Sequence, residues 1–137
     1  MVDIFSRRKR SEIMRKIGPE NSSIELNINN ILKSLYFSFH SHDKSLPGKP
    51  DFVFLLKKKI IFVNGCFWHG HQNCRRSVLP TTNKKFWKDK ISSNILRDKS
   101  NYRKLNRMGW SYKVLWQCRL VKKSNNEIAH ILTKFLR

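Results

Sequence analysis

Acidic residues are scarce in this chain: 9 Asp and Glu accompany 29 Lys and Arg among 137 residues, so the formal net charge is +20. Such a surplus favours a soluble polyanion as partner, usually nucleic acid, because each Lys or Arg that meets a phosphate releases counterions. From charge alone, a ribosome-associated or merely Lys-rich surface is the alternative. The most cationic region is 75–107, which has 11 basic residues and 2 acidic ones.

Other absences narrow the class of protein further. The chain has no apolar run of membrane length, no recognisable secretory signal, no repeat and no low-complexity segment. We therefore expect one domain over 1–137, beginning with a basic arm over 1–20, and no membrane partner. Three cysteines cannot form a closed set of disulfides, which favours a reducing interior where thiolates bind metal.

Hydrophobic periodicity predicts an α/β fold. Apolar residues recur at helical spacing over 22–36, where Ser22 and Glu25 make a capping box, and over 86–108, which Gly109 ends. Strands are expected at 36–42, 51–56, 60–63 and 110–116, the second and third as a hairpin, and a last helix is capped at 124–127. This order lets helices cover both faces of a small mixed sheet.

Metal ligands gather in one short stretch of the chain. Cys66, His71 and Cys74 follow a Cys-x4-His-x2-Cys spacing that suits a tetrahedral zinc loop, and Cys118 far downstream supplies a fourth ligand. A closed set of four ligands leaves no position for substrate, so this zinc would be structural. His69 is the competing ligand by spacing.

Four acidic or basic residues are candidates for catalysis. Asp51 follows a proline at the start of a predicted buried strand, where Mg²⁺-dependent nucleases hold a carboxylate; the alternative is turn chemistry. An imidazole exchanges protons near neutral pH, so His69 could activate water while Asp98 orients its ring. Asp98 could equally be a plain helix-surface acid, and the capping box alone explains Glu25.

The aromatic residues Phe67, Trp68 and Trp87 lie among cationic ones. Phe67 and Trp68 stand between metal ligands and are held too tightly to reach a distant core, so we expect something outside the fold to receive them. Aromatic side chains can stack on bases or wedge between base steps, most easily where a mismatch lowers the unstacking energy. Trp87 has an equally good interpretation as a core residue of its helix.

Several separated motifs together resemble the very-short-patch repair endonucleases, bacterial mismatch nickases of the restriction-endonuclease-like superfamily. The matching motifs, in the family's order, are Ile13–Ile17, Ser23–Glu25, Leu46–Val53, Ile61–His69, Phe86–Trp87, Asn94, Arg97–Asp98 and Gly109–Trp110. The resemblance implies a restriction-endonuclease-like fold and a nick on the 5′ side of the thymine in a T·G mismatch, the lesion left when 5-methylcytosine deaminates. Double-stranded DNA would be the partner, with a functional link to a cytosine-5 DNA methyltransferase and to mismatch-repair proteins. We expect a monomer in the bacterial cytoplasm.

The resemblance also implies roles for individual residues. Asp51 and the backbone carbonyl of Val63 would hold the catalytic Mg²⁺. His69 would activate water, and Asp98 and Glu25 would surround His69, linked to it by hydrogen bonds and metal-bound waters. The structural zinc ligands would be Cys66, His71, Cys74 and Cys118, and the DNA-intercalating aromatics would be Phe67, Trp68 and Trp87.

Two positions depart from the family. Asn64 stands where well-known members carry an active-site His, which weakens proton transfer there, although an amide still hydrogen-bonds a phosphate oxygen or a water. The loop between His71 and Cys74 is one residue longer than in the best-known member. Two alternatives follow: a catalytically weakened, zinc-containing DNA-binding module, or a related enzyme that cuts a different mismatch.

Overall fold

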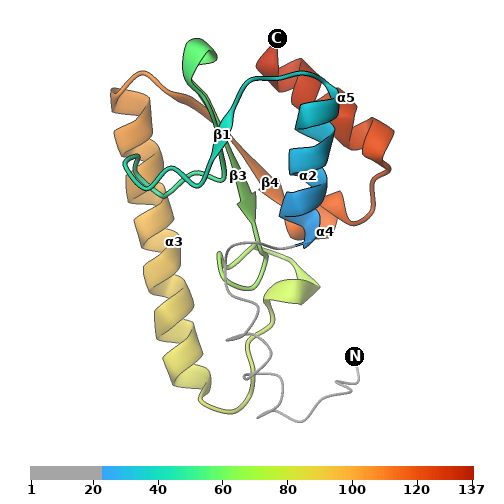
Figure 1. Cartoon of the computed structure of the whole chain (residues 1–137). Helices are drawn as coiled ribbons and strands as arrows, with labels where there is room; N and C mark the ends of the chain where they lie inside the picture. Colours follow the sequence, from blue (N-terminus) through green and yellow to red (C-terminus); the bar gives the residue numbers. More distant parts are fainter. Residues whose placement is uncertain (1–22) are drawn as a thin grey trace.

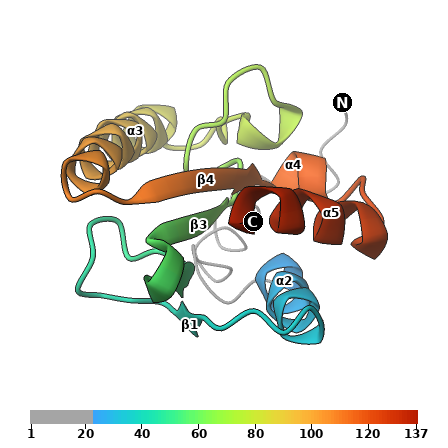
Figure 2. The same cartoon turned by 90° about the horizontal axis from the view of Figure 1, so that it is seen from above.

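A four-stranded sheet forms the centre of the protein, and helices lie on both of its faces (Figure 1, Figure 2). The computed structural model describes residues 23–137. Its main elements are α2 (Ser23–Ser34), β1 (His40–Ser41), β2 (Phe52–Phe54), β3 (Lys59–Asn64), α3 (Lys84–Arg107), β4 (Ser111–Trp116), α4 (Gln117–Leu120) and α5 (Asn125–Leu136). The basic arm, the motif Ile13–Ile17 and Ser22 of the expected capping box lie outside the described residues.

The sheet is mixed, with its strands in the order β1-β2-β3-β4. β1 pairs antiparallel with β2 and β2 antiparallel with β3, whereas β3 pairs parallel with β4. Parallel neighbours need a crossover connection, and α3 supplies it between β3 and β4. The expected α/β class, the hairpin and the mixed sheet are therefore confirmed.

The second strand is shorter than the sequence pattern predicts. β2 ends at Phe54 because Leu55–Lys57 form the 3-10 turn η1, which the left-handed residue Lys58 (φ 52°) closes. This tight turn leads the chain directly back into β3. It leaves Leu55 and Leu56 exposed at the hairpin tip.

Alternation along β2 builds one apolar cluster on each face of the sheet. Phe52 and Phe54 pack with residues of α2 and α5, whereas Val53 between them packs with Leu105 of α3. Figure 2 shows these helices on opposite sides of the strands. Because successive side chains of a strand point to opposite faces, the side chains of β3 also alternate between the two clusters. The last residues of β3 reach the edge of the sheet where the candidate site lies.

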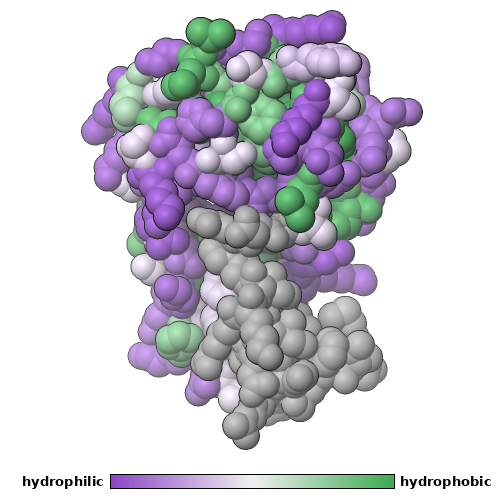
Figure 3. Space-filling model, viewed as in Figure 1, coloured by the Kyte–Doolittle hydropathy of each residue, from purple (hydrophilic) through white to green (hydrophobic). Residues whose placement is uncertain are grey.

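The crossover helix α3 is apolar on one stripe and cationic elsewhere. Trp87, Ile91 and Leu105 are buried, but Met108 is 46% exposed because the helix ends one residue before it. All 11 basic residues of the region 75–107 are exposed, and the surface over α3 at the left of Figure 3 is mostly hydrophilic. Within 23–137, no helix is long and apolar enough to cross a membrane.

Candidate active site and metal centres

A cavity of about 600 Å³ opens where β3 ends and the metal loop (residues 65–74) begins. The segment before β2 and the middle of α3 form its other walls. Counting Asn64, there are five candidate catalytic residues, and four of them line this cavity: Asp51, Asn64, His69 and Asp98. They come from four different segments of the chain, so the fold brings them together.

Asp51 is held against the end of β3. Its Oδ2 accepts a hydrogen bond of 2.7 Å from the backbone N–H of Val63, and the residue is 7% exposed. In an extended strand the N–H and C=O of one residue point to the same side, so the Val63 carbonyl in β3 faces the same edge. Carboxylate and carbonyl oxygens are ligands that Mg²⁺ accepts, and this donor pair fits that ion.

His69 is bound by Asp98 across the gap between the metal loop and α3. His69 Nδ1 lies 2.6 Å from Asp98 Oδ2, and the two side chains are 18% and 16% exposed. An ionised carboxylate accepts a hydrogen bond, so the contact favours the proton on Nδ1 and leaves the Nε2 lone pair to accept another. This contact replaces the alternative interpretation of Asp98 as a plain helix-surface acid.

Hydrogen bonds and close packing connect the metal loop to α3 next to the His69–Asp98 pair. The Asn94 side chain donates a hydrogen bond of 3.0 Å to the carbonyl of Trp68, and Arg97 donates one of 3.1 Å to Asn94 Oδ1. Gly70 has a φ of 58°, and a Cβ there would come within 2.7 Å of both Ile91 and Ile95. The loop therefore needs glycine at this point, both for its backbone conformation and for its approach to the helix.

Asn64 is 2% exposed at the end of β3. Its Nδ2 donates a hydrogen bond of 3.3 Å to the hydroxyl of Tyr102 on α3. Burial raises the pKa of Tyr102 to about 12, against the opposite effect of the hydrogen bond from Asn64. The hydroxyl is therefore neutral under ordinary conditions and serves as a fixed partner for the amide.

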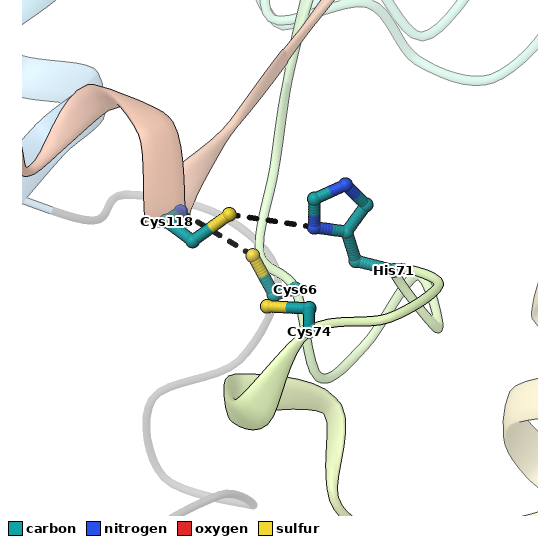
Figure 4. A group of neighbouring side chains, drawn as sticks. All are labelled: Cys66, His71, Cys74 and Cys118. Carbon is teal, nitrogen blue, oxygen red and sulfur yellow. Dashed lines mark hydrogen bonds between the residues drawn. The ribbon is translucent and has the colours of Figure 1, made fainter.

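Cys66, His71, Cys74 and Cys118 form the second candidate site (Figure 4). Their ligand atoms all lie within 4.8 Å of one another. Cys118 Sγ is 3.4 Å from His71 Nδ1, and the Cys118 N–H donates a hydrogen bond of 3.3 Å to Cys66 Sγ. His69, the competing ligand by spacing, is instead turned to Asp98.

The donor set of this cluster fits zinc. Three sulfurs and one imidazole are a typical structural set for Zn²⁺. Burial raises the pKa of the Cys66 thiol to about 12, so a cation is needed to hold it as a thiolate. Burial, followed by the charge of Arg119, lowers the pKa of His71, which favours the neutral imidazole that binds metal.

The three aromatic candidates pack on one another, which differs from the expectation for Phe67 and Trp68. Phe67, Trp68 and Trp87 make edge-to-face contacts with centroids 5.3 to 5.9 Å apart. Phe67 is 4% and Trp87 2% exposed, because the metal loop folds onto α3 and forms a small apolar cluster there. Both indole N–H groups are buried without a hydrogen-bond partner among the described residues.

Sequence reasoning missed His42, which the structure places between two carboxylates. Its Nε2 contacts Glu25 Oε1 and lies 3.9 Å from Asp51 Oδ1. Glu25 therefore reaches the active-site edge from α2, beyond any capping role. The alternating pattern over 36–42 signals a strand, but nothing local indicates which residue of the next strand would face His42.

The comparisons with known proteins agree on one family. The sequence profile of the family described as DNA mismatch endonuclease Vsr matches residues 2–76. The type II nicking enzyme V.XorIIP of Xanthomonas oryzae pv. oryzae is 38% identical over 120 residues, which cover 88% of each chain. The DNA mismatch endonuclease Vsr of Escherichia coli (strain K12) is 37% identical over 120 residues, 88% of this chain and 76% of that one. The type II nicking enzyme V.NmeAIP of Neisseria meningitidis is 37% identical over 124 residues, 90% and 88% of the two chains.

Proposed function

Because the chain belongs to the DNA mismatch endonuclease Vsr family, we propose that it nicks duplex DNA on the 5′ side of the thymine in a T·G mismatch, by Mg²⁺-dependent hydrolysis. Family membership already supports an endonuclease with DNA as its partner. The observation that carries the finer proposal is that Asp51, His69 and Asp98 meet at one cavity. The lesion would be the product of 5-methylcytosine deamination, which links the protein to a cytosine-5 DNA methyltransferase and to mismatch-repair proteins.

Asp51 and the Val63 carbonyl are the groups that would hold Mg²⁺. Asp51 Oδ2 already accepts the Val63 N–H, so its orientation is set before any cation arrives. A single carboxylate and a carbonyl leave most of the ion's coordination to water and substrate, as Mg²⁺ prefers. When bound, the ion would neutralise charge on the scissile phosphate.

His69 would take a proton from the attacking water. Asp98 holds Nδ1, so the Nε2 lone pair is the base, and the developing imidazolium stays beside a carboxylate. Lys90 and Arg97 line the same cavity and would bind backbone phosphates, which positions the strand for in-line attack. The Asn64 amide, fixed by Tyr102, has a second N–H for a phosphate oxygen or a water.

The aromatic cluster would recognise the mismatch. Inserting Phe67, Trp68 or Trp87 between base steps requires opening the packed cluster and unstacking the DNA, and a mispaired step resists unstacking less. The two indole N–H groups without partners in 23–137 favour such an opening, because a buried, unpaired donor destabilises the closed arrangement. Mismatched DNA would therefore be selected at the unstacking step, because opening the cluster is common to paired and mismatched duplexes.

A nicking assay on an end-labelled T·G duplex with Mg²⁺ tests the proposal. Asp51→Ala should bind the duplex and fail to nick it, whereas Asp89→Ala, an exposed acid on α3, should nick normally. Trp68→Ala should lose discrimination between T·G and paired DNA. Full activity of Asp51→Ala would remove the assignment of that carboxylate. Binding without any nicking by the unmodified chain would favour the catalytically weakened DNA-binding module, and cleavage of another mismatch in the same assay would favour the related enzyme.

A further inference from the structure

Phe86 is the exposed end of the aromatic cluster. Its ring lies edge-to-face on Trp87 with centroids 5.1 Å apart, and Trp87 contacts Phe67 and Trp68 of the metal loop in the same way. Phe86 is 53% exposed, whereas Trp87 is 2% and Phe67 4% exposed. Ring contacts therefore run without a break from the buried part of the cluster to the protein surface.

Helical spacing places Phe86 on the side of α3 that faces the cavity. Lys90 and Arg97, which line the cavity, follow Phe86 by four and eleven residues, which are about one and three whole turns. Leu96 is also strongly exposed on α3, but it does not line the cavity. It is two residues from the cavity residue Asn94 and so lies on the other side of the helix.

The rise of an α-helix sets the distance between Phe86 and the cavity. Four residues correspond to about 6 Å along the axis of α3, which is less than two base steps of about 3.4 Å in one DNA strand. Figure 1 shows the first half of α3 extending beyond the ends of the strands. A DNA strand that meets Lys90 at the cavity wall would therefore also pass Phe86.

The surroundings of Phe86 suit a polyanion. Lys84, Lys85 and Lys88 stand close to Phe86 in the sequence, and all three are exposed. An apolar protein surface would be a poor partner for this ring, because the neighbouring ammonium groups would lose water without gaining partners. DNA offers phosphates to the lysines and the faces of its bases to the ring.

Phe86 can act without the opening that the buried rings require. Its exposed face is accessible while Trp87 stays packed, because the contact with Trp87 covers only part of the Phe86 ring. A mispaired base leaves the stack more easily than a paired one, and an aromatic side chain replaces part of the stacking that the base loses. An exposed ring here would therefore favour mismatched DNA over paired DNA.

We propose that Phe86 is a further specificity-determining residue, whose exposed ring stacks on a nucleobase at the mismatched step. The inference deepens the proposed function and rests on it for the identity of the mismatch. The contact with DNA is measurable by binding alone, without Mg²⁺ and without nicking.

Binding of the zinc-loaded full chain to a fluorescein-labelled T·G duplex and to its paired T·A counterpart, followed by anisotropy without Mg²⁺, tests the contact. Phe86→Leu keeps an apolar side chain against Trp87 but removes the ring. It should bind the T·G duplex at least about 5-fold more weakly and the paired duplex with little change. Phe86→Tyr keeps the ring and should bind both duplexes as the unmodified chain does. Leu96→Ala, the matched control on the other side of α3, should also bind both normally.

Unchanged affinity of Phe86→Leu for the T·G duplex would overturn the proposal and leave Phe86 as a cover for Trp87. An equal loss for the paired duplex, or an equal loss in Phe86→Tyr, would overturn it too, because neither depends on stacking of the ring on a displaced base. Nicking of the T·G duplex by the unmodified chain together with any of these results removes the contact and keeps the proposed function. Weaker T·G binding by Phe86→Leu but not by Leu96→Ala, without nicking by the unmodified chain in Mg²⁺, keeps the contact and removes the proposed function.

Discussion

The imidazole of His71 lies flat against the indole of Trp116, with ring centroids 4.1 Å apart and planes 9° from parallel. Trp116 ends β4, and Cys118 follows it in α4, so the end of the parallel strand provides both the stacking ring and a ligand. The candidate zinc cluster therefore joins the metal loop to the sheet. It also carries a fluorescent reporter in direct contact with one ligand.

We expect the purified chain to contain one zinc ion, and Cys118→Ser to lose it. Loss should lower the free energy of unfolding by about 4 kcal/mol or more, because the ion joins distant segments. Zinc content by mass spectrometry and urea unfolding measure these effects. Gln72→Ala, an exposed change in the same loop, should keep both the zinc and the stability.

Removing zinc with a chelator should change the tryptophan fluorescence, since the imidazole beside Trp116 is released from the ion. The change should be much smaller in Trp116→Phe, although Trp68, Trp87 and Trp110 are still present. An undiminished change in Trp116→Phe would show that the signal comes from the aromatic cluster of the metal loop instead.

Asp98→Asn should slow nicking by roughly 10- to 100-fold, because an amide holds the His69 imidazole less firmly in the reactive tautomer. The measurement is the single-turnover rate at saturating enzyme, which separates chemistry from binding. The affinity for T·G duplex should be unchanged. Asp89→Asn, on the same helix and exposed, is the control, and an equal loss in that variant would point to a general effect of charge on α3.

We expect Tyr102 to lose its hydroxyl proton only at an unusually high pH, as a separate late step in the titration. Burial raises the pKa of Tyr102 to about 12 from an ordinary value of 10.0. A raised folded-state pKa means that the contribution of Tyr102 to stability is complete below pH 10 and is lost as the pH rises toward 12. Ultraviolet titration of tyrosinate should resolve this step, and Tyr102→Phe should remove it. A late step that persists in that variant would contradict the assignment to Tyr102.

The salt dependence of DNA binding should report which lysines meet phosphates. Lys90→Ala, at the wall of the cavity, should reduce the slope of log K against log salt by about 0.9, the value of one phosphate contact. Lys134→Ala, an equally exposed lysine on α5 across the sheet, should leave the slope unchanged. The reverse result would place the DNA on the α2 and α5 side.

The features that the sequence predicts correctly depend on residues that are close together in the chain. Helical periodicity identifies α3 and α5, and Ser124 with Glu127 forms the expected capping box at the start of α5. The Cys-x4-His-x2-Cys spacing places three potential ligands in one loop. Such features depend on neighbours a few residues apart, and the family motifs are local in the same sense, so they are visible without a fold.

His42 is a residue whose surroundings could not be predicted from such local patterns. Its side chain matters because the β1–β2 register sets it opposite Asp51 and because α2 brings Glu25 to the same point. Strand register is determined by pairing over the whole sheet, and a shift of one residue would turn the imidazole to the other face. No spacing along the chain carries that information.

The amino-acid sequence by itself determined the α/β class, the strongly cationic surface, the family and the identities of the residues that can bind metal or move protons. Only the tertiary structure decided which partners they have: His69 with Asp98, His71 with the three cysteines, and Phe67 packed against Trp87. Residue types set what chemistry is available. Partner choice depends on contacts between distant segments, which form only when the metal loop folds against α3 and the end of β4.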